Sequence, residues 1–298
     1  MRVLLTGRHG QIGSHLGHLL LNVCECRLVS REEFDLKKPS NLRAALTSFK
    51  PDLIVNTAAY TDVDGAEKNR EHAFAVNALA PGVMADWCAA NNAAMIHFST
   101  DYVYDGSGKN PHFEDAEPRP VNVYGESKLA GDRAIASSGI PHLILRTSWI
   151  YSASGSNFLV TMLRLGAAQE KLSVVSDQIG APTSAELVAS TTASIIKQIH
   201  DCGIREIFEK ANLVHCTASG QTSWHGFSEA IFSGARLRGA QLRVKEVRPV
   251  SSVEYPTPAT RPANSRLSLK RLKENYAIET PNWRDELDNV LDKIFGLR

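Results

Sequence analysis

The sequence has few cysteines, and their spacing excludes the usual cysteine-based sites. Five cysteines are scattered along 298 residues: Cys24, Cys26, Cys88, Cys202 and Cys216. The number is odd, and the Cys24-x-Cys26 spacing suits neither a zinc knuckle nor a redox pair. We therefore predict five reduced thiols, most of them packing residues, in a cytoplasmic protein.

The sequence also lacks an excess of either charge and a long hydrophobic run. Thirty-three basic residues face 32 acidic ones, for a formal net charge of +1. This balance gives no electrostatic footprint for nucleic acid or an anionic membrane. No apolar run approaches the roughly 20 residues that span a bilayer, and the N-terminal residues show no signal-peptide pattern. We expect neither a nucleic-acid nor a membrane partner.

Strand and helix patterns alternate through the first half of the chain. Apolar runs predict strands over residues 2–6, 26–29, 52–56, 95–99 and 142–146, and helical spacing predicts helices over 11–21, 41–49, 71–91 and 124–137. This alternation predicts an α/β fold with a doubly wound parallel, Rossmann-like sheet. Its strand order is not readable from the pattern.

The alternation of strand and helix patterns becomes less regular after Arg146. Helices are predicted over 157–169, 185–200, 224–237 and 283–295, and Pro256, Pro258 and Pro262 mark an irregular loop. We predict an NAD(P)-binding domain over residues 1–150 and a smaller substrate-binding lobe over 151–298, interwoven with the core, with an approximate boundary.

A glycine-rich turn follows the first predicted strand. Residues 6–13 read TGRHGQIG, which places Gly7, Gly10 and Gly13 between a strand and a helix. Glycines permit a tight turn and let backbone amides reach a pyrophosphate at the helix N-terminus. A purely structural turn would explain the spacing alone, but its position predicts a dinucleotide site.

The end of the second predicted strand bears on cofactor choice. NAD-selective sites place an acid there, whereas this chain has Ser30 and Arg31. A hydroxyl and a guanidinium suit a 2′-phosphate, which favours NADPH and leaves NADH possible. The alternative is that Arg31 is a solvated surface residue. Asp35 and Leu36 are candidates for the adenine pocket, and residues 58–61 (Ala58, Ala59, Tyr60 and Thr61) follow the third strand at the ligand-binding edge.

Tyr124 and Lys128 form the second chemical motif. Four residues make about one helical turn, so both side chains can face one site. A nearby ammonium would lower the tyrosine pKa from about 10 and make an efficient general acid for an alkoxide. Chance produces this spacing often, so it gains weight only beside the glycine loop.

A hydroxyl-rich segment ends the fourth predicted strand. Ser99, Thr100 and Asp101 lie at the edge where ligands bind. A hydroxyl there can hydrogen-bond a reacting carbonyl beside Tyr124. Ordinary turn chemistry explains the same residues equally well.

These motifs together resemble the extended short-chain dehydrogenase/reductases. Five further strings narrow the resemblance to the dTDP-4-dehydrorhamnose reductase family: STDYVYDG, NVYGESKLAG, RTSWIY, DQIGAPT and RPANSRL. The likeness runs from Met1 to about Trp283. It implies reduction of the C4 ketone of dTDP-4-dehydro-β-L-rhamnose to dTDP-L-rhamnose with NADPH or NADH, the last step of a pathway that feeds cell-surface polysaccharide.

The resemblance also implies roles for individual residues. Tyr124 would deliver the proton, Lys128 would hold the nicotinamide ribose and lower the tyrosine pKa, and Thr100 would assist at the carbonyl. Implied substrate contacts are Thr100, Asp101, Tyr124 and Trp149, and implied cofactor contacts are Gly10, Gln11, Ile12, Asp35, Leu36, Ala59, Tyr60 and Thr61.

Trp149 follows the fifth predicted strand at the same edge, so it can pack on the nicotinamide or the sugar. Filling the core is the alternative.

Two later loops are candidates for polar contacts with the sugar nucleotide: Gln178, Gly180, Pro182 and Thr183 in the first, and Pro262, Asn264, Ser265 and the guanidinium groups of Arg261 and Arg266 in the second. Turn chemistry alone would also account for them.

One departure concerns metal. Some family members form a homodimer linked by Mg²⁺ through carboxylates, but this chain has His15 and Lys293 where two acids would be expected, and Glu186 alone has a counterpart. Mg²⁺ prefers hard oxygen ligands, so we expect no magnesium-bridged interface. A homodimer without metal stays possible.

Three other functions are alternatives to the reductase that the resemblance implies. A sugar-nucleotide dehydratase would need an Asp-Glu pair, but Asp101 is followed by Tyr102; an epimerase or a reductase of another nucleotide sugar stays open. A regulatory NADP-binding subunit, similar to the β subunit of methionine adenosyltransferase, is a second alternative, and a redox-sensing module is a third. The strings of the second half favour catalysis.

Overall fold

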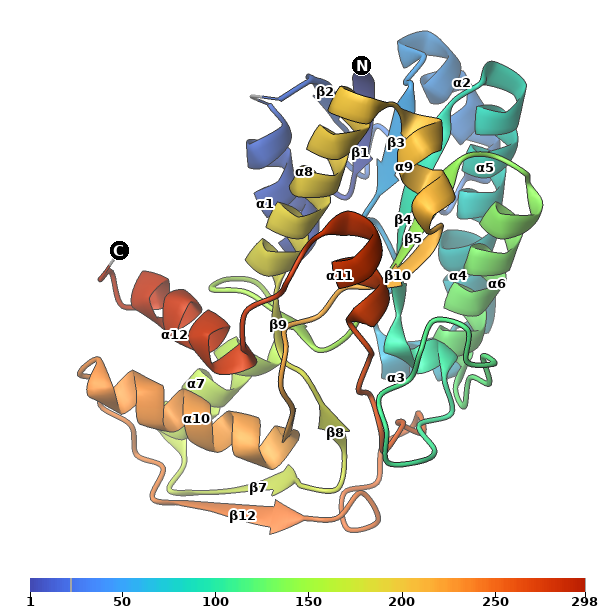
Figure 1. The fold of residues 1–298 in the computed structure, drawn as a ribbon. Coiled ribbons are helices and arrows are strands. Elements are labelled where there is room, and N and C mark those ends of the chain that lie inside the picture. The colour runs from blue at the N-terminus through green and yellow to red at the C-terminus, as the bar shows by residue number, and fades with distance from the viewer. Residues whose placement is uncertain (22, 298) are drawn as a thin grey trace.

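A six-stranded parallel sheet forms the centre of the molecule (Figure 1). The computed structural model describes residues 1–21 and 23–297. The strands lie in the order β10-β5-β4-β3-β1-β2: β1 (Arg2–Thr6), β2 (Glu25–Leu28), β3 (Leu53–Asn56), β4 (Ala94–Thr100), β5 (His142–Thr147) and β10 (Leu213–His215). Every pairing between them is parallel. The predicted parallel sheet is confirmed, with strand limits shifted by at most one residue.

The inner strands are continuous apolar runs because helices cover both faces of the sheet. On one face lie α1 (Gln11–Leu20), α8 (Ala185–Cys202), α9 (Ile204–Lys210) and α11 (Lys270–Tyr276). The other face carries α2 (Pro39–Phe49), α5 (Ala80–Asn91) and α6 (Val123–Ser137). The strand order reverses direction between β1 and β3, so their carboxyl ends leave a crevice for a ligand.

The predicted helix over 71–91 is divided in the structure. It consists of α4 (Arg70–Phe74), a π-helical turn η1 (Ala75–Leu79) and α5, and it is preceded by the short α3 (Val63–Lys68). This stretch, Arg70–Asn91, has the length and apolarity of a membrane span by composition, but half of that window is buried inside the fold. The π-turn buries Asn77, whose side chain bonds the backbone of Tyr60 and Ser127 Oγ.

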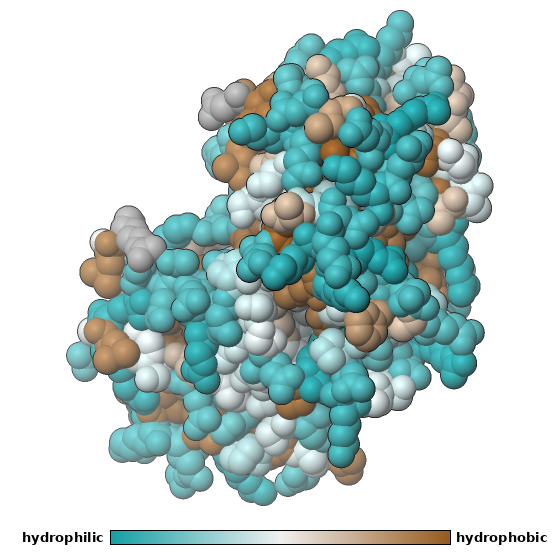
Figure 2. Space-filling view, viewed as in Figure 1, coloured by the Kyte–Doolittle hydropathy of each residue, from teal (hydrophilic) through white to brown (hydrophobic). Residues whose placement is uncertain are grey.

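A second lobe has a hydrophobic core of its own (Figure 1, lower left). It contains α7 (Phe158–Ala168), α10 (Trp224–Leu237), α12 (Trp283–Ile294) and the parallel pair β7 (Lys171–Val175) and β12 (Glu246–Val250), with two short pairs of strands, β6 (Ile150–Tyr151) with β9 (Thr183–Ser184) and β8 (Ile179–Gly180) with β11 (Thr222–Ser223). The surface seen in Figure 2 is largely hydrophilic, with apolar residues scattered across it.

The chain passes between the two parts more than once. After α7 and β7, it returns to the main sheet in α8, α9 and β10, and again in α11. Residues well beyond 150 therefore contribute to the first core, and a division at that position stays a prediction.

Candidate active site

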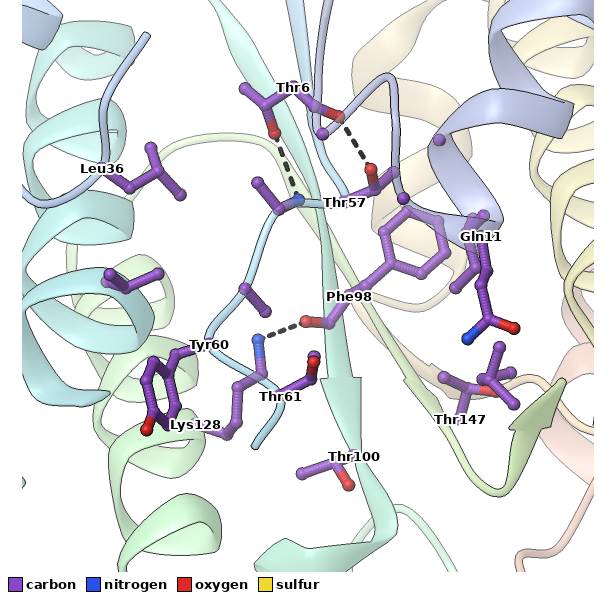
Figure 3. Close-up of a pocket in the computed structure, with 18 of the residues that line it drawn as sticks. Thr6, Gln11, Leu36, Thr57, Tyr60, Thr61, Phe98, Thr100, Lys128 and Thr147 are labelled. Atoms are coloured by element: carbon purple, nitrogen blue, oxygen red, sulfur yellow. Dashed lines mark hydrogen bonds between the residues drawn. The ribbon is translucent and has the colours of Figure 1, made fainter. Parts of the chain in front are cut away.

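A cleft of about 1010 Å³ lies at the carboxyl ends of the strands. It brings together the predicted cofactor and catalytic residues and the substrate contacts that precede residue 150: Gly7, Gly10, Gln11, Ile12, Gly13, Ser30, Arg31, Asp35, Leu36, Ala58, Ala59, Tyr60, Thr61, Ser99, Thr100, Asp101, Tyr124, Lys128 and Trp149. Their separation in sequence is bridged by the parallel sheet, which directs one end of each strand to the same edge. Figure 3 shows part of the cleft lining, with Thr6, Thr57 and Thr100 at strand ends.

The glycine loop packs too tightly for side chains. Gly7 has a φ of +70°, and a Cβ on Gly13 would lie 2.1 Å from the Gly7 carbonyl oxygen. The first turn of α1, which is described in full, carries no acidic residue, and no side chain caps it. Its amides are therefore open to a negatively charged group, which fits the diphosphate of a dinucleotide.

Gln11 joins the glycine loop to the second lobe. Its Oε1 atom accepts hydrogen bonds from Ser152 Oγ at 2.9 Å and from Asn157 Nδ2 at 3.0 Å. Asn157 in turn caps α7 by accepting from the Val160 amide. The second lobe is thereby held directly over the N-terminus of α1.

The end of β2 carries charges of both signs. Arg31 is exposed and lines the cleft beside the half-buried Asp35. Glu33 Oε2 accepts from the Ser30 amide at 2.9 Å. Lys37 and His72 line the same region. Burial and the positive charges of Lys37 and Arg31 lower the pKa of His72. No local signal in the sequence pointed to Lys37 or His72, because the fold alone brings them to Arg31.

Thr100 and Tyr124 meet on the floor of the cleft. Thr100 ends β4 and donates to Asp101 Oδ1 at 3.1 Å, and Tyr124 lies in the first turn of α6, with its hydroxyl near that of Thr100. Burial raises the pKa of Tyr124, Thr100 opposes that shift, and the charge of Asp101 adds to it. Lys128 is not among the groups that shift this pKa in the structure, so its lowering of the Tyr124 pKa stays a prediction.

The reason lies in the direction of the Lys128 side chain. Its Nζ atom donates to the Phe98 carbonyl oxygen at 2.5 Å (Figure 3) and lies 3.1 Å from His97 Nε2. Both partners belong to β4, so the ammonium faces the sheet. Burial lowers the pKa of Lys128 to about 8, and the nearby Asp132 opposes that shift.

Asp101 is a buried carboxyl group beside the reactive pair. Burial raises its pKa to about 7, against hydrogen bonds with Ser265 and Thr100. Its Oδ2 atom has no hydrogen-bond partner within the described part of the chain. A buried unpaired oxygen is costly, so Asp101 is suited to accept a hydrogen bond from a polar ligand.

Two stacked tryptophans line the opposite side of the cleft. The rings of Trp149 and Trp224 lie 3.6 Å apart and nearly parallel, and Trp149 has an unusual φ of +50°. Trp224 Nε1 donates to Gln178 Oε1 at 3.2 Å. The ring of Trp149 also lies against Gly180, where a Cβ would be 2.6 Å away. Sequence reasoning missed Trp224, since the first residue of an amphipathic helix gives no functional signal.

The polar side chains of the two later loops bond to other residues of the chain. Arg261 forms an ion pair with Asp64, with Nη2 and Oδ2 2.7 Å apart, and Arg266 donates to Asn264 Oδ1 at 2.8 Å. None of the predicted loop residues is among those that line the cleft: Gln178, Gly180, Pro182, Thr183, Arg261, Pro262, Asn264, Ser265 and Arg266. Their contact with substrate stays a prediction.

The surface expected to be free of magnesium contains an ion-pair cluster. Lys293 Nζ contacts Glu186 Oε2, and His15 Nε2 lies 3.7 Å from Glu186 Oε1. Across residues 1–21 and 23–297, no group of three or more His, Cys, Asp or Glu side chains is placed to hold a metal ion. A lysine cation on the Glu186 carboxylate does not fit a divalent cation site.

Comparison with known proteins identifies the family. A family model described as the RmlD substrate binding domain matches residues 1–295. The dTDP-4-dehydrorhamnose reductase of Burkholderia thailandensis is 42% identical over 289 residues, covering 95% of this chain and 96% of the relative. The chain belongs to the RmlD family. The resemblance seen in the sequence is confirmed, and the chain is an oxidoreductase.

Other RmlD relatives match over almost their whole length. The dTDP-4-dehydrorhamnose reductase of Escherichia coli K12 is 39% identical over 299 residues, covering 99% of this chain and 98% of the relative. The crystal structure of dTDP-4-dehydrorhamnose reductase from Bacillus anthracis in complex with NADP has a TM-score of 0.87 and 32% identity, covering 98% of this chain and 99% of that one. The Rossmann-like fold expected from the sequence is confirmed over the whole chain.

Proposed function

We propose that this RmlD-family chain reduces the C4 ketone of dTDP-4-dehydro-β-L-rhamnose to dTDP-L-rhamnose with NADPH, with NADH as a possible substitute. The observation that carries the proposal is the Thr100–Tyr124 pair at the floor of a cleft that begins at a glycine loop. Relatives that align from end to end are named for this reaction. In the cell, the product would serve cell-surface polysaccharide.

The cleft suits a nicotinamide dinucleotide. The tight turn that Gly7 and Gly13 permit and the uncapped N-terminus of α1 fit its diphosphate. Arg31 and Lys37 supply positive charge for a 2′-phosphate, which favours NADPH. When bound, the nicotinamide supplies the hydride.

Tyr124 is the proposed proton donor. Its raised pKa keeps the hydroxyl protonated at neutral pH, so it is a general acid in the resting protein. As negative charge develops on the ketone oxygen, Tyr124 transfers its proton there, and the Thr100 hydroxyl stabilises the same oxygen by a hydrogen bond. Lys128, one helical turn away, supplies the positive charge that favours the phenolate left behind. Asp101 and Trp149 are the proposed sugar contacts.

The reaction itself is the direct test. The protein is mixed with NADPH and enzymatically generated dTDP-4-dehydro-L-rhamnose, nicotinamide absorbance is followed, and the product is identified by mass and sugar analysis. We expect stoichiometric loss of absorbance and formation of dTDP-L-rhamnose. Absence of turnover in protein that binds NADPH tightly would overturn the proposal and point first to another sugar nucleotide, then to a regulatory subunit.

A further inference from the structure

A line of buried side chains runs from Lys128 across the sheet to the glycine loop. His97 on β4 is fully buried, with Nε2 3.1 Å from Lys128 Nζ and Nδ1 3.1 Å from Asn56 Nδ2 on β3. Asn56 Oδ1 accepts from Thr6 Oγ1 on β1 at 2.7 Å. Thr6 immediately precedes Gly7. The mechanism proposed above uses Lys128 and Gly7 but leaves the residues between them without a role.

We propose that His97 is a positioning residue that holds Lys128 in both of its charge states and links its charge to the glycine loop. The proposal rests on the proposed function only in giving Lys128 a place in the active site. His97 touches no reacting atom, because it lies behind Lys128 and does not line the cleft.

The hydrogen-bond donors and acceptors along this line of side chains support a positioning role for His97. In the orientation found in the structure, the Asn56 amide nitrogen faces His97 Nδ1, so that ring atom accepts and the ring proton resides on Nε2, directed at Lys128. This arrangement suits a neutral amine, which can accept. An ammonium can only donate, so it needs the proton on Nδ1 and the Asn56 amide turned over, with its nitrogen towards Thr6. A neutral imidazole meets both requirements without leaving a buried polar atom unpaired.

Burial, more than the surrounding charges, keeps the His97 ring neutral. Asp132 on α6 lies near it, with Oδ1 4.0 Å from His97 Nε2, and is held by Arg146 on β5 with Nη2 and Oδ2 3.3 Å apart. Asp101 and Tyr124 line the cleft together with Lys128. Burial, together with the Lys128 charge, lowers the pKa of His97 well below its usual value. The single basic group that titrates near neutral pH in this cluster is therefore Lys128, as far as the described residues show.

The test measures the titration of Lys128 directly. In protein labelled with ¹³C at lysine Cε, the Lys128 signal is assigned by its loss in Lys128→Met and followed against pH. We expect wild-type Lys128 to titrate near pH 8. His97→Leu removes an acceptor from the ammonium, which should lower the pKa by about one unit, a tenfold change in the proton affinity. His97→Gln presents an amide oxygen near the position of Nε2 and should restore the wild-type value.

Two further variants keep the outcome decisive. His97→Asn, which reaches Asn56 but not Lys128, should behave like His97→Leu and serves if the leucine variant does not fold. His142→Leu is the matched control, since His142 is a buried histidine on β5 whose Nδ1 bonds the Ile140 carbonyl oxygen; it should leave the Lys128 titration unchanged.

NADPH binding followed by fluorescence supplies the second readout. The pH at which the dissociation constant changes should move with the Lys128 pKa in His97→Leu or His97→Asn and return in His97→Gln. An unchanged Lys128 titration in folded His97→Leu and His97→Asn would overturn the inference. The proposed reductase activity would survive that result, because the titration requires no turnover; conversely, a failed turnover assay leaves the titration readable.

Discussion

Tyr124 carries the largest share of the proposed chemistry. Replacing it by Phe removes one hydroxyl beside Thr100 and leaves the ring in its buried place. General acid catalysis contributes roughly 10²–10⁴-fold, so we expect Tyr124→Phe to lower kcat by about that factor. Steady-state kinetics and a fluorescence titration with NADPH measure the two effects separately, and cofactor affinity should stay within about twofold. A variant with near-normal turnover would remove Tyr124 as the proton donor.

Arg31 determines cofactor choice in the same proposal. A charge-assisted hydrogen bond contributes about 1.5–3 kcal/mol, so Arg31→Ala should weaken NADPH binding roughly 10- to 100-fold and NADH binding much less. Dissociation constants for both cofactors check this. Arg27→Ala is the matched control, because Arg27 lies on β2 near Glu33 and is not among the residues that line the cleft. Equal losses for NADPH and NADH would show that Arg31 does not read the 2′-phosphate.

At the scale of one element, the position of α1 depends on glycines that have no Cβ atom. A Cβ on Gly13 would lie 2.1 Å from backbone, so Gly13→Ala must push the glycine loop away from the helix. We expect loss of NADPH binding by at least tenfold and destabilisation by about 1–3 kcal/mol. Isothermal titration and urea unfolding measure the two effects.

Another helical glycine provides the comparison. At Gly82 in α5, a Cβ would meet only Ala134 Cβ at 3.5 Å, an ordinary contact. Gly82→Ala should therefore stabilise the protein by about 0.5–1 kcal/mol through helix propensity and leave NADPH binding unchanged. If both variants bind NADPH normally, the close packing of the loop is not needed for the cofactor.

For the whole molecule, the buried Lys128 ties stability to pH. Its pKa falls from 10.5 to about 8 on folding, so between these values the unfolded chain binds more protons, and stability rises with pH through that window. The shift corresponds to roughly 3 kcal/mol that opposes folding at neutral pH.

Lys128→Met isolates this contribution. Relative to wild type, the variant should be more stable at pH 7, and the difference should shrink by roughly 3 kcal/mol by pH 10.5, while turnover is lost. Urea unfolding of both proteins across this range measures it, with Lys171→Met, at an exposed lysine paired with Glu246, as the baseline. A difference that stays constant with pH would contradict the lowered pKa.

The sequence by itself determined the first five strands of the main sheet, the main helices and about half of the residues that line the cleft. Buried parallel strands are short apolar runs, which a local pattern can predict. The glycine loop and Thr100 lie at the ends of such strands, and Tyr124 lies at the start of a predicted helix, so local patterns also predict their place at the ligand-binding edge. The short helices α9 and α11 and the β7–β12 pairing were not foreseen, because brief elements stabilised by distant contacts leave weak local periodicity.

Only the tertiary structure decided what the side chains contact. Lys128 faces His97 and Phe98 on β4, Trp224 stacks on Trp149, and Lys37 and His72 join Arg31. Most of these contacts join residues far apart in the chain, and burial shifts the pKa of the groups involved. Desolvation depends on every element packed around a group. The four-residue spacing of Tyr124 and Lys128 therefore could not predict the raised pKa of Tyr124.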